Sequence, residues 1–167
     1  MDALVDWLRF TQLSLLFQQE VGWLWPLCES VHFLGLCVLI GTAGFFDLRL
    51  LGFLRSVPLH AAWRLIPWAK AALFANFLTG LVFLISQPDQ YVRNVSMWFK
   101  LLFLLLAGVN ALVFEWFYSR KLMALDPHGD PPLAAKAIGA VSLVSWFAVM
   151  YFGRMIPYLV PDPVSGV

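Results

Sequence analysis

Trp25-Pro-Leu-Cys-Glu-Ser-Val-His-Phe-Leu-Gly-Leu-Cys-Val-Leu-Ile-Gly-Thr-Ala-Gly-Phe-Phe46 is the apolar stretch that decides the fold of this chain. A helix rises about 1.5 Å per residue and the hydrocarbon core of a bilayer is roughly 30 Å thick, so about 20 apolar residues span it. The stretch is therefore long enough to cross a membrane. It also carries two ionisable residues, Glu29 and His32, which lie one turn apart on the same face of a helix.

The whole chain has the composition of an integral membrane protein. Its 167 residues are 61% hydrophobic and 16% aromatic, and only 13% are charged, whereas about 25% of the residues of a typical soluble domain are charged. The length allows one compact domain of several spans with short loops. The net charge is +1 and no basic run occurs, so nucleic acid is excluded as a partner and the lipid bilayer is expected as one.

Three further apolar stretches follow the first, and together they predict an all-α membrane protein, a four-transmembrane-helix antiparallel bundle. The expected spans are about 23–46, 67–86, 97–118 and 133–156, within a membrane domain at 21–160. Residues 1–20 mix apolar and polar side chains in a pattern typical of an amphipathic helix in the membrane interface, and full insertion would make them a fifth span. Residues 161–167 form a short tail.

Two local patterns predict contacts between the spans. Asp47 and Arg49 follow span 1 two residues apart, on different faces of a helix, so each is expected to pair with another element unless both are an ordinary charged span end. In span 4, small residues recur every three positions, which lets a neighbouring helix approach closely. These small residues are Gly139, Ser142, Ser145 and Ala148.

The orientation follows from the positive residues. Lys and Arg are concentrated in the connector between spans 1 and 2 and in the connector between spans 3 and 4, which must lie on one side of the membrane. Short loops rich in Lys and Arg favour the cytoplasmic side. We therefore expect both connectors in the cytoplasm and both termini outside it. The residues concerned are Arg49, Arg55, Arg64, Arg120, Lys121 and Lys136.

With this topology, four ionisable residues from three spans share the outer half of the membrane. Glu29 and His32 descend from the outer surface in span 1, while Lys100 opens span 3 and Arg154 ends span 4 at that surface. Ionisable groups inside a bilayer cost about 2.5 kcal/mol or more unless they are paired, ligated or hydrated. Such a group is by default a candidate functional site.

Two interpretations of this cluster compete. In a structural network, Glu29 would pair with Lys100 or Arg154 and merely fix the helix register. In a haem b site, His32 would be the axial ligand of the iron and Glu29 would orient or protonate it. Lys100 and Arg154 would then hold the propionates or a substrate. Met150, one turn from Arg154, is the candidate second ligand, and five-coordinate iron is the other option.

The predicted function follows from the haem interpretation. We expect a b-type haem-binding redox or electron-transfer component, such as a haem-dependent membrane oxidoreductase or its subunit, with a membrane redox partner. The alternative is a non-catalytic accessory subunit of a larger membrane complex, and a homo-oligomer is compatible with both. A proton or ion pathway is a third possibility, less favoured because the inner half offers only Asp47, Lys70 and Glu115 near its mouth.

Several motifs spread over nearly the whole chain resemble an uncharacterised family of bacterial four-span membrane proteins. They are Glu29-Ser-Val-His32, Asp47-Leu-Arg-Leu-Leu-Gly52, Leu65-Ile-Pro-Trp68, Lys100 with Ala107-Gly-Val-Asn-Ala-Leu112, and Gly153-Arg154. The resemblance implies a bacterial inner-membrane protein but assigns no chemistry. More distantly, the chain is similar to the four-helix haem-binding protoporphyrinogen oxidase and copper-resistance membrane families. That similarity implies that His32 is a haem ligand and Lys100 a functional lysine.

Overall fold

The computed structural model describes residues 22–124 and 126–159, together with Trp7 and Thr11. Within these residues, four helical stretches are long and apolar enough to cross a membrane. They are Leu24–Leu50, Leu59–Ser86, Val95–Met123 and Leu133–Tyr158. The predicted all-α four-span architecture is therefore confirmed, whereas the predicted interfacial helix at 1–20 and the tail at 161–167 lie outside the described residues.

The helices follow one another with short connections. In order they are α3 (Leu24–Leu50), α4 (Leu59–Trp63), α5 (Ile66–Ser86), α6 (Pro88–Val92), α7 (Val95–Val113), the π-helix η2 (Phe114–Tyr118), α8 (Ser119–Met123), α9 (Leu133–Met155) and the 3-10 helix η3 (Ile156–Tyr158). Pro67 lies in the first turn of α5, where its missing N–H costs nothing. The side chain of Asn94 caps α7 by accepting a hydrogen bond from the Ser96 N–H.

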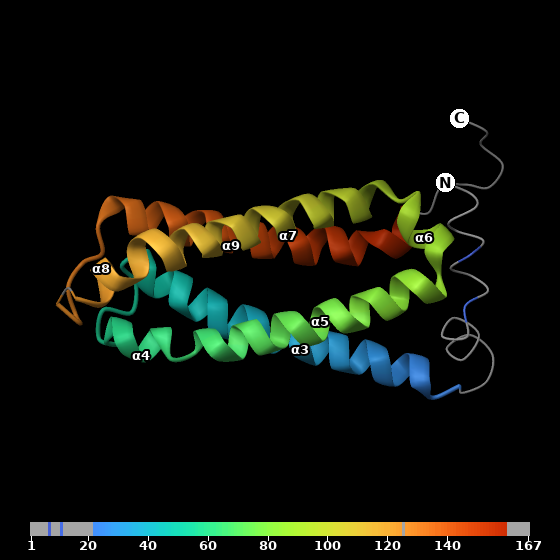
Figure 1. Ribbon diagram of the computed structural model, residues 1–167, viewed down its shortest axis with the longest axis horizontal. Helices are drawn as coiled ribbons and strands as arrows, with labels where there is room; N and C mark the ends of the chain where they lie inside the picture. Colours follow the sequence, from blue (N-terminus) through green and yellow to red (C-terminus); the bar gives the residue numbers. More distant parts are fainter. Residues whose placement is uncertain (1–6, 8–10, 12–21, 125, 160–167) are drawn as a thin grey trace.

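The four spans form two antiparallel hairpins (Figure 1). Helix α3 packs along α5 and α7 packs along α9, while an interface between α3 and α9 joins the hairpins. In contrast, α5 and α7 share few contacts. The connectors that contain α4 and α8 lie at one end of the bundle, here called the loop end, and α6 lies at the opposite end, here called the terminal end.

The α3–α9 interface is close because α9 carries a glycine there. A Cβ built on Gly139 would lie 2.9 Å from the backbone oxygen of Asp47 and 3.0 Å from Cβ of Leu50, closer than real Cβ atoms approach a neighbouring backbone. Ser145, two turns along α9, is fully buried. The small residues of span 4 therefore do allow the close helix approach that their spacing predicts.

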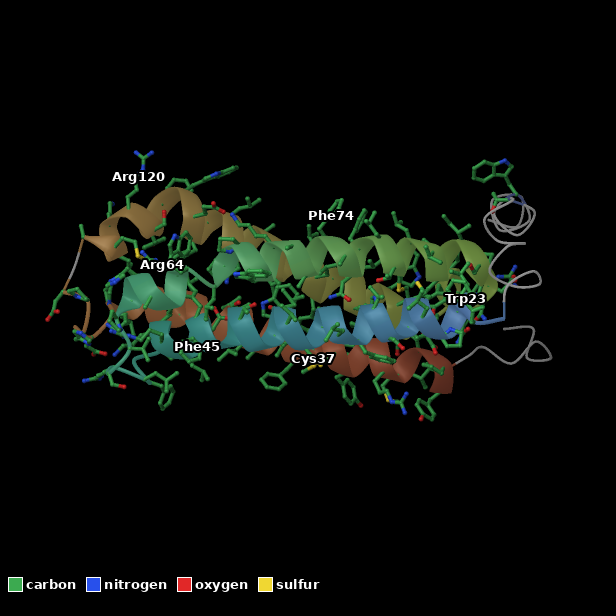
Figure 2. All side chains as sticks on the ribbon, turned by 90° about the horizontal axis from the view of Figure 1, so that it is seen from below. Trp23, Cys37, Phe45, Arg64, Phe74 and Arg120 are labelled. Carbon is green, nitrogen blue, oxygen red and sulfur yellow. The ribbon has the colours of Figure 1, made fainter. Side chains whose placement is uncertain are left out.

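The outer faces of the helices carry large apolar side chains (Figure 2). Phe74 points away from the bundle and is 64% exposed, and similar residues cover much of α7. The long stretch that contains α7 is the least buried of the four. Lipid covers such surfaces, whereas a soluble monomer rarely exposes large apolar patches. Together with the length of the helices, these surfaces make the chain a multi-pass membrane protein.

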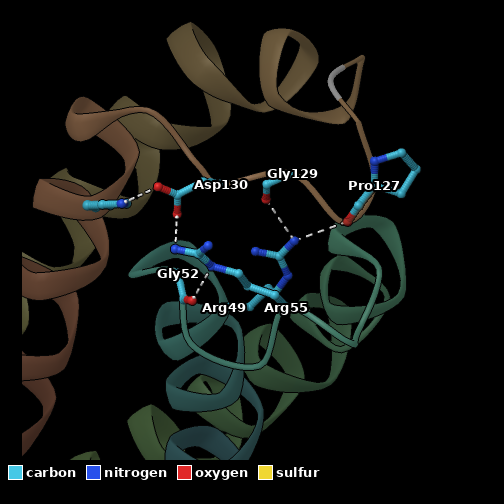
Figure 3. A network of polar contacts seen from close by, with 7 residues as sticks. Arg49, Gly52, Arg55, Pro127, Gly129 and Asp130 are labelled. Atoms are coloured by element: carbon cyan, nitrogen blue, oxygen red, sulfur yellow. Dashed lines mark hydrogen bonds and ion pairs between the residues drawn. The ribbon is translucent and has the colours of Figure 1, made fainter.

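Arg49 fastens the two connectors of the loop end to each other (Figure 3). Its side chain is 0% exposed, and Nε donates a 2.8 Å hydrogen bond to the carbonyl of Val57 in the first connector. Nη2 donates to the carbonyls of Pro127 and Gly129 in the second, both at 3.1 Å. These bonds pair Nε and Nη2 of the buried guanidinium with both connectors, and α3 continues to Leu50, beyond the end of the predicted span at about Phe46.

A second contact between the connectors lies at the surface beside Arg49 (Figure 3). Asp130 accepts a hydrogen bond from Nη2 of Arg55 at 3.0 Å and one from Nζ of Lys136 at 2.7 Å. The hydrogen bond from Lys136, together with the positive charge of Arg55, holds the pKa of Asp130 below its usual 3.8. The carboxylate is therefore ionised throughout the neutral range and links the first connector to the start of α9.

This depressed pKa predicts an acid-sensitive loop end. A carboxyl group whose pKa is lower in the folded state stabilises the fold above its unfolded pKa and loses that contribution as the pH falls through the folded value. Acidification below the usual 3.8 should therefore remove the stabilisation from Asp130. The melting temperature in detergent should fall less steeply with acid in Asp130→Asn than in the wild type. Parallel acid profiles of the two proteins would contradict this assignment.

Candidate functional site

His32 lies in the terminal-end half of the bundle and faces α5. Its Nδ1 lies 2.6 Å from the hydroxyl oxygen of Thr79, and its ring packs against Phe83 with centroids 5.2 Å apart. The Thr79 hydroxyl itself donates to the carbonyl of Ala75 at 2.9 Å. With the hydroxyl hydrogen on the Ala75 carbonyl, Nδ1 of His32 is the donor and Nε2 carries the lone pair. The imidazole is thus oriented like a metal-ligating histidine.

Lys100 comes close to this imidazole from the other hairpin. Its side chain lies against α9, with Nζ 3.7 Å from the position of a Cβ built on Gly153, and its charge acts on His32. Asn76, one turn from Thr79, packs over Gly35 of α3, and neither of its amide atoms has a hydrogen-bond partner in the described part of the chain. The terminal-end half therefore assembles His32, Thr79, Asn76 and Lys100.

The other predicted members of this site lie elsewhere. Glu29 is exposed, and within the described residues it forms no ion pair with Lys100 or Arg154. Arg154 is also exposed and donates a 3.1 Å hydrogen bond to the hydroxyl of Tyr158. Met150 is half-buried on α9, and no described contact joins it to His32. The predicted ion pairs of Glu29 are therefore not formed.

Tyr91 of α6 shares the environment of Glu29. Burial, followed by the charges of Glu29 and Cys28, raises the pKa of the Tyr91 phenol to about 12. The phenol is therefore protonated at neutral pH. Glu29 lies one turn from His32 in the sequence motif. It nevertheless lies towards the connector between α5 and α7 and not in the bundle centre.

The loop-end half contains a cavity of about 110 Å³ lined by all four spans, here called the Asp47 cavity. Most of its wall is apolar, and four aromatic side chains contribute to it. Its polar residues are Asp47, Lys70, Asn110, Glu115 and Ser142, and its aromatic ones are Phe46, Trp63, Phe114 and Trp146. Small side chains leave the space free, since Ala43, Ala69, Ala107 and Ala111 also line it.

Asp47 is the buried acid of this cavity. Its side chain is 4% exposed and it receives a hydrogen bond from the side chain of Ser142 on α9. Its Oδ2 has no hydrogen-bond partner in the part of the chain that the structure describes. A buried carboxyl oxygen without a partner costs free energy, so such an atom signals a ligand, a proton or water in the functional state.

Lys70 and Glu115 form an ion pair between the Asp47 cavity and the surface. Nζ of Lys70 lies 2.8 Å from each carboxylate oxygen of Glu115, and the two side chains are 58% and 40% exposed. Glu115 lies within the π-helix η2, a local widening that is frequent at functional sites. The pair bridges α5 to η2, at the side where α5 and α7 share few contacts.

An apolar layer separates the Asp47 cavity from His32. Leu39, Ala72, Ala107 and Trp146 belong to one buried cluster between the two polar groups. The structure therefore brings the predicted residues together in two sets: His32 with Lys100 in one half, and Asp47 with Lys70 and Glu115 in the other. The sequence predicts the second set only as charged residues near the mouth of the inner half of the bundle. Ser142 and the aromatic residues of the cavity wall join this set through helix packing.

These features define the class of protein as a small four-span helical membrane protein with a buried acid in its core. A family model described as a family of unknown function, DUF6644, matches residues 4–159. The chain belongs to this family. No curated protein and no solved structure is significantly similar to it.

Proposed function

We propose that this protein exchanges protons at Asp47 and acts as a proton-dependent transport protein of the bacterial inner membrane. One observation carries the proposal: the unpartnered Oδ2 of Asp47 belongs to a buried acid that lines a cavity between all four spans. Ionisable residues inside membrane bundles are characteristic of proton and substrate routes. From the sequence alone such a route is the least favoured of the three, because the inner half offers only Asp47, Lys70 and Glu115 near its mouth.

The residues of the Asp47 cavity have distinct parts in this proposal. Asp47 binds and releases the proton, and Ser142 holds its carboxyl group in place. A volume of about 110 Å³ has room for a few water molecules, each occupying about 30 Å³ in the liquid. Water there would carry protons to the exposed Lys70–Glu115 pair. The apolar layer around Leu39 and Trp146 would be the barrier that protons released from Asp47 cross to reach the terminal end.

The proposal predicts proton flux that depends on one carboxyl group. Purified protein in vesicles containing a pH indicator should acidify the lumen when a potassium diffusion potential is applied. Asp47→Asn should reduce the flux to that of protein-free vesicles, because an amide cannot exchange the proton. Infrared difference spectra after a pH jump should also lose one carboxyl band in this variant.

The matched control is Asp126→Asn, the same chemical change in an exposed loop residue. It should leave the flux and the carboxyl band of Asp47 unchanged. The proposal fails if wild-type vesicles are no more permeable to protons than empty ones and no carboxyl band is specific to Asp47.

A b-type haem at His32 is the second candidate, favoured by the Nδ1–Thr79 hydrogen bond that leaves Nε2 as the lone-pair atom. Lys100 is the candidate propionate partner, because its charge acts on His32. Glu29 and Arg154 are exposed, and no described hydrogen bond or ion pair joins either of them to His32 or Lys100. A bound haem would supply one-electron redox chemistry, as in an electron-transfer component or an oxidoreductase subunit.

Spectroscopy distinguishes this second candidate from the first. Protein made in haem-replete cells and extracted with detergent would show a Soret band that His32→Ala abolishes. His60→Ala, which changes an exposed histidine of the connector, would keep it. A purified protein without a Soret band and without a pyridine haemochrome would eliminate the haem.

The remaining proposals concern placement and partners. The loop end carries Arg55, Arg64, Arg120, Lys121 and Lys136, which supports a cytoplasmic loop end and termini on the opposite side. The apolar outer face of α7 is compatible with a second copy, a membrane redox partner or a larger complex in which this chain is an accessory subunit. Tags at each terminus, probed from outside intact cells, test the orientation.

A further inference from the structure

We propose that the Asp47 cavity binds a small organic cation, an alkylammonium ion smaller than benzene. This inference rests on the proposed role of Asp47 as the free acid of the cavity and goes further by naming the chemical class of its ligand. Three features of the walls support it: an uncompensated carboxyl group, aromatic side chains and a small volume.

The charges around the cavity leave one carboxyl group for a ligand. Lys70 is the cation that lines the cavity, and both oxygens of Glu115 hold it at 2.8 Å. Arg49 lies two residues beyond Asp47, but its Nε and Nη2 hydrogen bonds go to connector carbonyls. Asp47 therefore has no ion-pair partner within the described residues, and a bound cation would complete the pairing that buried charges require.

Aromatic rings form the wall beside this carboxyl group. Phe46, Trp63 and Phe114 contact one another in a triangle, with ring centroids 5.4, 5.4 and 5.5 Å apart. Trp146 lines the cavity from α9. Aromatic rings attract cations through their quadrupole, most strongly in desolvated sites, and they are the usual walls of sites for quaternary ammonium groups. An anion would instead meet the carboxylate of Asp47 and be repelled.

The volume of the cavity limits the size of the cation. It measures about 110 Å³, whereas an apolar cavity that holds benzene measures about 150 Å³. Methylammonium and dimethylammonium are therefore suitable in size, whereas tetramethylammonium, which is larger than benzene, and cations with long alkyl chains are not. A ligand would enter beside the Lys70–Glu115 pair, whose side chains line the cavity and also reach the surface.

Calorimetric titration of the purified protein in detergent tests the inference with methylammonium as the probe. We expect saturable binding by the wild type, and no binding of the neutral analogue methanol or of the oversized tetrabutylammonium. Asp47→Asn should abolish binding, while Asp126→Asn should preserve it. Trp63→Leu, which keeps the carboxyl group, should weaken binding by about 2- to 30-fold through loss of one aromatic wall.

The outcomes also separate this inference from proton exchange. Proton flux in vesicles without any ammonium ion, combined with no saturable binding of methylammonium, overturns the cation site and leaves proton exchange standing. Saturable binding that requires Asp47, with no proton flux, supports the cation site while proton exchange fails. Equal binding by the wild type and Asp47→Asn, in proteins with the same circular dichroism and melting temperature, overturns the cation site.

Discussion

Replacing Arg49 with methionine should destabilise the protein by about 3 kcal/mol or more, because hydrogen bonds from a charged group contribute about 1.5–3 kcal/mol each. Methionine fills a similar volume but donates no hydrogen bond, so the carbonyls of Val57, Pro127 and Gly129 lose their partner. The two connectors would then separate. Part of this loss of stability is offset, because the substitution also removes Nη1 of Arg49, which is buried without a partner among the described residues.

The measurement for Arg49→Met is thermal unfolding in detergent. Arg64→Met is the matched control, since Arg64 is an exposed arginine of the same connector region, and it should change the melting temperature little. Limited proteolysis of the two connectors provides a second readout. If Arg49→Met and Arg64→Met melt alike and resist protease alike, Arg49 does not hold the loop end together.

Gly139→Leu should have the other large effect. Overpacking should lower the free energy of unfolding by about 1–3 kcal/mol or more. Even the first carbon of the new side chain would lie 2.9 Å from the backbone oxygen of Asp47 and 3.0 Å from Leu50. Backbone cannot move aside as a flexible side chain can, so α3 and α9 must separate. Such a separation would also displace Asp47 from Ser142 and open the cavity wall.

A glycine elsewhere in the bundle provides the control for Gly139. Gly108 of α7 has no atom within 4 Å of its built Cβ, so Gly108→Leu should be tolerated in folding and melting assays. Gly108→Ala should even stabilise the helix by roughly 0.5–1 kcal/mol. Similar melting temperatures for Gly139→Leu and Gly108→Leu would show that the α3–α9 interface is looser than described.

The sequence was sufficient to predict the four spans because each is a long apolar run bounded by polar residues or proline. The apolar run ends at Phe46, whereas α3 continues to Leu50, since Asp47 and Arg49 do not interrupt a helix and both are buried by packing against other elements. Nε and Nη2 of Arg49 donate hydrogen bonds to carbonyls of the two connectors, most of them distant in sequence. Such partners become visible only once the two connectors lie side by side.

The depth of the candidate site residues in the membrane could be predicted from the sequence, but the direction in which their side chains point could not. The sequence predicts His32 in the outer half of the membrane, and the structure joins it there to Thr79 of α5. The rotation of each helix about its own axis was not predictable, because it depends on close contacts such as Asn76 over Gly35. That rotation exposes Glu29 and Arg154 and turns Asp47 towards Ser142. The spacing of residues along one helix does not show which residues of the neighbouring helix they contact.

The unequal packing of the four spans has a mechanical consequence. Each hairpin is held along its length by its own interface, and the hairpins touch mainly between α3 and α9. A rotation of one hairpin about that contact would change the separation of α5 and α7 more than that of any other neighbouring pair. It would stretch the Lys70–Glu115 bond first and widen the Asp47 cavity while leaving both hairpins intact. Such a rotation would change the access of Asp47 to the surrounding membrane.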